Sequence, residues 1–167
     1  MKNGLAAAII FVSITGWAAS PSENLIESCL QAHSTASSIT IHDIAQDTVL
    51  QEDNYAPGFN ATYIFKYKGA DVGYANGKRD QALIYSGKLY PLSKSIPLDN
   101  GKPVKYSEFN PALAQWSLAK EGRQRYLCVG FNFDGLGQSG SFQNVYGGYL
   151  LNLNNKNLYF AVRDVRR

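Results

Sequence analysis

Histidine is scarce in this sequence, which holds only His33 and His42. Neither belongs to a pair at a metal-binding spacing, and no third ligand lies beside them in the chain. Glu52 and Asp53 are adjacent acids, but the glycine and acidic spacing of a calcium loop is missing around them. A GxSxG elbow, which would mark a catalytic serine, is also missing. We therefore expect no metal site and no catalytic residues.

Long apolar runs are equally rare, since the chain has only one, from Leu5 to Trp17. Lys2 precedes the run and the small residues 18–20 follow it, which is the pattern of a secretory signal peptide. The run is shorter than the roughly 20 apolar residues that span a bilayer. We predict that residues 1–18 are a cleaved signal peptide and that residues 19–167 form a single compact domain. The released protein is then periplasmic or secreted and not membrane-embedded.

Cysteine occurs only at Cys29 and Cys128. In an oxidising compartment, an even pair of thiols usually forms a disulfide bond. A nucleophilic cysteine would instead need a lowered thiol pKa and a partner base, and the chain offers only two imidazoles for that role. The sequence therefore predicts a Cys29–Cys128 bridge.

Basic residues are absent between Ala19 and Phe65, where six acidic residues occur. From Lys66 onward, fifteen basic residues stand against seven acidic ones. This asymmetry either steers a charged partner or reflects an acidic section that packs beside a basic sheet. Nucleic acid is not an expected partner, because the mature chain is nearly neutral overall.

Two segments carry helix signals. Ser20-Pro21-Ser22-Glu23 has the spacing of a capping box, with Pro at the first helical position. The residues that follow recur at three- and four-residue intervals and predict one buried face: Leu25, Ile26, Cys29, Leu30, His33 and Ala36. Asn110-Pro111 predicts the start of a second helix, which continues through Ala112 to Lys120.

The rest of the chain favours β-strands. Strands are predicted around Ile39 to Ile44, at Thr48 to Gln51, Ala61 to Lys68, Ala82 to Tyr85, Lys88 to Leu92, Arg125 to Phe133, Phe142 to Leu153 and Leu158 to Val165. We predict an α+β fold with a mostly antiparallel twisted sheet, either open or partly closed into a barrel. The N-terminal helix and one further helix pack on it. Because Cys128 alternates with Leu127 and Val129, the bridge places the first helix on one face of a central strand.

The segment from Gly135 to Gly140 spells GxGxxG, the dinucleotide-binding motif. That motif requires a following helix to hold the pyrophosphate, whereas Ser141 to Leu153 is strand-like, so we expect no cofactor. The segment is either a plain surface connection or a recognition loop. In the second case its polar members Asp134, Gln138 and Ser139 would contact a partner.

The segment Ser86-Gly87-Lys88-Leu89-Tyr90 resembles, in spacing, the SGxxY loop of periplasmic inhibitors of C-type and I-type lysozymes. In those families the loop enters the lysozyme cleft, so the resemblance implies that Ser86, Gly87 and Tyr90 form a partner-binding site, in which Tyr90, just beyond the loop, would support it from the sheet. The second motif of the C-type inhibitors, with its tyrosine and lysine-glycine, has no clear counterpart here. An ordinary Ser-Gly hairpin explains the same five residues.

These features lead us to expect an exported periplasmic protein that binds another protein, such as an inhibitor or immunity protein against a cell-wall-degrading enzyme or toxin. The chain has eleven tyrosines, and tyrosine supplies large contact area with little loss of entropy. One alternative is a module that binds a small ligand or the cell envelope in an aromatic-lined pocket. A second is a hydrolase whose site is dispersed through the sequence.

Overall fold

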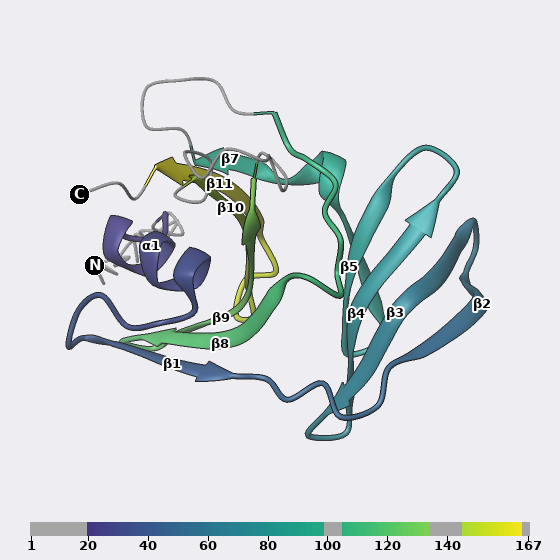
Figure 1. Cartoon of the computed structure of the whole chain (residues 1–167), viewed down its shortest axis with the longest axis horizontal. Coiled ribbons are helices and arrows are strands. Elements are labelled where there is room, and N and C mark those ends of the chain that lie inside the picture. Colours follow the sequence, from purple (N-terminus) through teal and green to yellow (C-terminus); the bar gives the residue numbers. More distant parts are fainter. Residues whose placement is uncertain (1–19, 99–104, 134–144, 165–167) are drawn as a thin grey trace, which may run out of the picture.

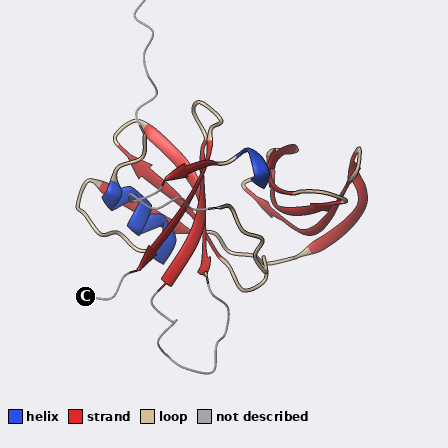
Figure 2. Cartoon of the chain, turned by 90° about the horizontal axis from the view of Figure 1, so that it is seen from above, coloured by secondary structure: helices blue, strands red, loops and turns tan. Residues whose placement is uncertain are grey.

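The chain folds into three layers in the computed structural model, which describes residues 20–98, 105–133 and 145–164. These residues form one α-helix, a short 3-10 helix and eleven strands in two sheets. The helix packs on one side of a six-stranded sheet, and a five-stranded sheet lies on the other side (Figure 1). The view from above separates the same three layers (Figure 2). The predicted signal peptide lies outside the described residues.

Helix α1 (Glu23–Gln31) confirms the predicted N-terminal helix, although its start differs from the expectation. The N-cap is Ser22 rather than Ser20, because the Ser22 hydroxyl accepts a hydrogen bond from the Leu25 backbone N–H at 3.2 Å. The same hydroxyl donates to Glu121 at 2.6 Å, which joins the start of the helix to the sheet. The cap is therefore fixed by a tertiary contact as well as by local chemistry.

The end of α1 overturns one expectation. Ala32 takes a left-handed conformation, with φ 51°, and this ends the helix at Gln31. His33 therefore lies beyond the helix and is exposed, so the prediction that it packs on the buried helical face is wrong. The face formed by Leu25, Ile26 and Leu30 is buried as predicted.

The disulfide bond between Cys29 and Cys128 is present, with the two Cα atoms 5.1 Å apart. Both cysteines are buried in the layer between α1 and the six-stranded sheet. Leu127 and Val129, on either side of Cys128, belong instead to the core between the two sheets. The prediction that this strand is covered on both faces is confirmed.

The six-stranded sheet is mostly antiparallel, and only its β11–β7 pairing is parallel. In spatial order its strands are β1 (Ile39–Asp43), β8 (Gln115–Glu121), β9 (Gln124–Asn132), β10 (Val145–Asn152), β11 (Leu158–Asp164) and β7 (Ile96–Leu98). The cysteine-bearing strand β9 has neighbours on both sides, as its sequence pattern predicts.

The five-stranded sheet is a meander of neighbouring antiparallel strands. Its strands, in both spatial and chain order, are β2 (Leu50–Ala56), β3 (Phe59–Tyr67), β4 (Ala70–Gly77), β5 (Gln81–Tyr85) and β6 (Lys88–Pro91). A 3-10 helix, η1 (Leu92–Lys94), follows β6 and leads into β7 of the other sheet. The β5–β6 hairpin confirms the prediction, whereas β4 was not predicted as a strand.

The described strands do not close into a barrel. They form two sheets, one with edges at β1 and β7 and the other with edges at β2 and β6. Side chains from both sheets fill the space between them, including Trp116 and Leu127 from one and Phe65 and Leu83 from the other. The partly closed single sheet is therefore corrected to two packed sheets, because the apolar faces bury each other.

The second predicted helix is wrong, since residues 115–121 form strand β8. Asn110 does cap a turn, because its side-chain oxygen accepts from the Ala112 backbone N–H at 3.0 Å, but the turn does not continue. Trp116 and Leu118 then face the core between the sheets, whereas Ala119 faces α1. A strand buries alternate side chains on its two opposite faces, and the free energy of this burial outweighs the helical propensity of the segment.

Candidate functional site

The Ser86–Gly87 turn projects from the end of the β5–β6 hairpin and is exposed. Ser86 and Gly87 have positive φ values of 51° and 73°, the conformation that two-residue hairpin turns favour. The backbone N–H of Ser86 donates to the carbonyl of Asp71 at 2.7 Å, which holds the turn against β4. The predicted Ser86–Gly87 turn is therefore a firmly held, solvent-facing tip.

A second turn, Lys68–Gly69, joins β3 to β4 at the same end of the sheet. Its two residues also have positive φ values, 50° and 79°. Both turns line one open hollow of about 420 Å³, together with Ala70 and Asp71. We call this pair of turns the twin-turn tip. It was not predicted, because only the Ser86–Gly87 half carries a recognisable motif.

Tyr90 lies on β6, just beyond the Ser86–Gly87 turn, and is partly buried. It pairs with Leu83 across the β5–β6 hairpin and packs against the core between the two sheets. Burial raises the pKa of its hydroxyl group, with a smaller contribution from Tyr85. Tyr90 therefore anchors the hairpin from the interior of the sandwich. The other predicted contact residues, Asp134, Gln138 and Ser139, lie outside the described residues.

A cleft of about 300 Å³ lies between the two sheets, next to the twin-turn tip, with which it shares Lys68 and Ala70. We call it the basic cleft. The residues that line it come from both sheets. The six-stranded sheet and the loop after β10 contribute His42, Leu118, Ala119, Lys120, Arg125 and Leu153. The five-stranded sheet and its β3–β4 turn contribute Tyr67, Lys68, Ala70 and Tyr85. None of these residues is acidic.

The charges of the basic cleft lie on both of its walls. Lys120 on β8 and Arg125 on β9 stand directly opposite each other in the antiparallel register. On the other wall, the Lys68 ammonium group lies 5.3 Å from the centre of the Tyr67 ring. Cations held beside aromatic faces in this way suit negatively charged ligands that also carry apolar groups. No sequence motif marks these residues, although the basic bias after Lys66 does include all three cations.

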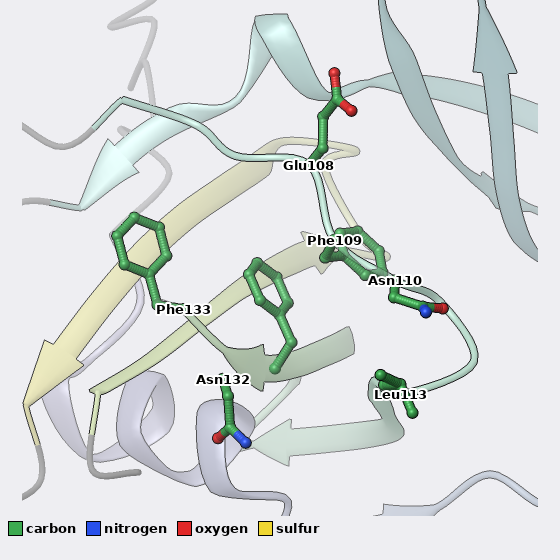
Figure 3. Close-up of a pocket in the computed structure, with 7 residues that line it drawn as sticks. Glu108, Phe109, Asn110, Leu113, Asn132 and Phe133 are labelled. Carbon is green, nitrogen blue, oxygen red and sulfur yellow. The ribbon is translucent and has the colours of Figure 1, made fainter. Parts of the chain in front are cut away.

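An aromatic pocket of about 480 Å³ lies between the segment before β8 and the end of β9. Phe109, Phe131 and Phe133 line it, and Phe109 stacks on Phe131 with ring centres 4.8 Å apart. Glu108 and Asn132 lie at opposite ends of the group, with Phe109 and Phe133 between them (Figure 3). The wall is therefore mostly apolar, with Glu108, Asn110 and Asn132 as its polar members.

Tyr149 fixes the segment that carries Phe109. Its hydroxyl group donates to the Ser107 carbonyl at 2.5 Å and accepts from the Ser107 backbone N–H at 3.2 Å. Burial raises the pKa of Tyr149 well above its usual value, so the hydroxyl group stays protonated and keeps donating. The aromatic pocket is thus held in shape by a buried hydrogen-bond pair.

No family model, curated protein or solved structure matches this chain. Within the described ranges, no three His, Cys, Asp or Glu side chains gather as a metal-binding group. Nor does that part of the chain contain a helix of the length and apolar character needed to cross a membrane.

Proposed function

We propose that this chain is an exported protein that binds another protein outside the reducing cytoplasm, as an inhibitor or immunity protein does. The apolar leader and the buried Cys29–Cys128 bridge support export into an oxidising compartment. The proposal assigns the chain a binding role rather than a catalytic one.

The observation that carries the proposal is the twin-turn tip. Ser86 and Gly87 are exposed, yet the hydrogen bond from Ser86 to Asp71 ties their turn to the neighbouring strand. Asp71 is itself held, since its carboxylate pairs with Lys66 and accepts a hydrogen bond from Tyr55 at 3.4 Å. A tip that is already ordered loses little entropy when it enters a partner's cleft.

A photo-cross-linking amino acid placed at Ser86 tests this proposal in cells that make the full chain. We expect one partner protein to be cross-linked from this position, because the residue lies at the centre of the proposed contact. Ser86→Asp should then weaken binding of that partner without lowering the melting temperature, since Asp tolerates the left-handed conformation of this turn.

Ser37 provides the matched control, because it is an exposed serine in the loop between α1 and β1. A cross-linker at Ser37 should not capture the same protein, and Ser37→Asp should leave binding unchanged. If Ser86 and Ser37 capture the same set of proteins to the same extent, the tip is not a recognition site.

The aromatic pocket supports a second candidate function, the binding of a small apolar ligand. Three phenylalanines around about 480 Å³, with Glu108, Asn110 and Asn132 beside them, match the usual composition of a ligand site. A bound organic molecule against Phe131, in protein purified from its own host, would support this function.

A further inference from the structure

The basic cleft contains two cations that the fold places in opposition. Lys120 and Arg125 are directly opposite across β8 and β9, and like charges in that relation destabilise a sheet. Neither belongs to an ion pair within the described residues, where the two ion pairs are Lys66–Asp71 and Arg163–Glu23. An anion bound between or beside them would reduce their mutual repulsion beyond what solvent screening does.

The rest of the cleft indicates what such an anion would be attached to. Leu118 and Leu153 provide apolar surface, and Tyr67 and Tyr85 face them from the other sheet. Lys68 adds a third cation on the tyrosine side, across the cleft from the other two. A ligand that meets all of these groups has apolar side chains in its middle and negative charges toward both walls.

We propose that the basic cleft binds an extended acidic segment of a partner protein, in which adjacent pairs of carboxylate side chains flank apolar ones, because neighbouring side chains of an extended segment point toward opposite walls. This inference rests on the proposed function and deepens it, because the cleft shares Lys68 and Ala70 with the twin-turn tip. One small anion does not account for cations on opposite walls, whereas a peptide reaches both. The tip would contact the partner's cleft while the basic cleft holds one of its acidic loops.

The test uses the purified protein and a short fluorescein-labelled peptide in which two pairs of adjacent Glu residues flank a central pair of Leu residues. Fluorescence anisotropy should show saturable binding that weakens as salt is added, because the charges are partly exposed and are screened. The same peptide with Gln in place of Glu should bind much more weakly. Inorganic phosphate is tested as a competitor in parallel.

The variant that tests the two cations is Lys120→Gln with Arg125→Gln. Affinity for the Glu peptide should fall by about tenfold, the expected loss for two partly exposed charge contacts. The melting temperature should stay the same or rise, because the repulsion across β8 and β9 is removed. If these two residues had a purely structural role, replacing them would lower the melting temperature instead.

Lys78 and Arg79 provide the matched control, since they are also an exposed lysine and arginine and lie in the β4–β5 connection. Lys78→Gln with Arg79→Gln changes the net charge by the same amount. It should leave the affinity for the Glu peptide within about twofold of wild type, as expected for screened, distant charges.

Three outcomes would overturn the proposal. The first is equal binding of the Glu and Gln peptides, and the second is binding of phosphate without binding of the Glu peptide. The third is self-association of the protein that Glu52→Lys abolishes. In that case the cleft would hold the exposed acidic strand β2 of a second copy rather than a partner protein. Cross-linking from Ser86 remains an independent measurement, so a failure of the cleft is distinguishable from a failure of the proposed function.

Discussion

A single buried arginine links three separate segments of the chain. The guanidinium group of Arg163 donates to the carbonyl oxygens of Leu98 and Val162 at 2.9 and 2.8 Å. It also pairs with both carboxylate oxygens of Glu23, in the first turn of α1. The Arg163 side chain is only 9% exposed, so its charge depends on these partners. The contact therefore ties the start of the helix to β7 and β11.

Glu23→Gln tests that contact. The hydrogen bonds from Arg163 lower the pKa of Glu23 below its usual 4.5, against a smaller opposing effect of burial. A carboxyl group whose pKa is lowered by folding stabilises the folded state at pH values above its unfolded-state pKa. This contribution is lost as pH falls through the lowered, folded-state pKa. We expect Glu23→Gln to reduce the free energy of unfolding by about 1 kcal/mol at pH 7, since half of the Glu23 side chain is exposed.

Urea denaturation of wild type and variant at pH 7 and pH 3 measures this effect. The difference should shrink at the acidic pH, as Glu23 becomes protonated in the folded as well as the unfolded state. Glu27→Gln on the same helix is the control and should change stability little at either pH. An equal loss for Glu23→Gln at both pH values would show that charge is not the cause.

Two glycines explain how α1 approaches the sheet. Gly130 on β9 and Gly148 on β10 are paired in the register beneath the end of the helix. A Cβ atom at Gly130 would lie 2.3 Å from the carbonyl oxygen of Leu30, and one at Gly148 would lie 2.4 Å from a Leu30 methyl group. The strands therefore accept glycine, despite its entropic cost, because the helix needs the space.

Gly130→Ala should consequently displace the end of α1. The clash is with a backbone carbonyl, which cannot rotate away as a side chain can, so we expect a loss of about 2–3 kcal/mol by thermal or urea denaturation. Gly122→Ala is the comparison, because it introduces strain at φ 57° with nothing within 4 Å of the new methyl group. Should both variants lose the same stability, steric contact with the helix is not the reason for glycine at 130.

Three of the four edge strands are poorly suited to pairing with another chain. β7 is only three residues long and contains Pro97, and β6 ends in Pro91. β2 is longer, but its pairing with β3 has register shifts and it carries the exposed acids Glu52 and Asp53. Short length, proline, charge and irregular register all discourage strand addition. The proposed recognition through a turn tip and a cleft does not use these edges.

At the scale of the whole molecule, the features with local or covalent causes were predictable from sequence. The β5–β6 hairpin depends on Ser86–Gly87, whose turn chemistry lies within the segment itself. The bridge between Cys29 and Cys128 follows from having only two cysteines. The alternation of Tyr63, Phe65 and Tyr67 likewise identifies the core-facing side of β3.

Features that depend on distant partners were not predictable. β8 is a strand because β1 and β9 pair with it on its two sides. The residues of β8 favour a helix, and nothing in their local sequence indicates these two pairing partners. β4 carries glycine at 73 because a side chain there would meet the Tyr63 backbone on β3. The basic cleft combines Lys68 with Lys120 and Arg125, which only the packing of two sheets brings together.

The disulfide bond should contribute most of its stability through the unfolded chain. It joins residues 99 positions apart, and closing a loop of that size is worth about 4–5 kcal/mol in the chain-entropy model. The purified protein should therefore show no alkylation without reductant, an intact mass two hydrogens below the reduced value, and a large drop in urea midpoint after reduction. Two freely alkylating thiols in native protein would contradict the bridge.

Because Cys128 faces α1 while the basic cleft opens on the opposite face of the sheet, reduced protein that remains folded should keep its affinity for the Glu peptide.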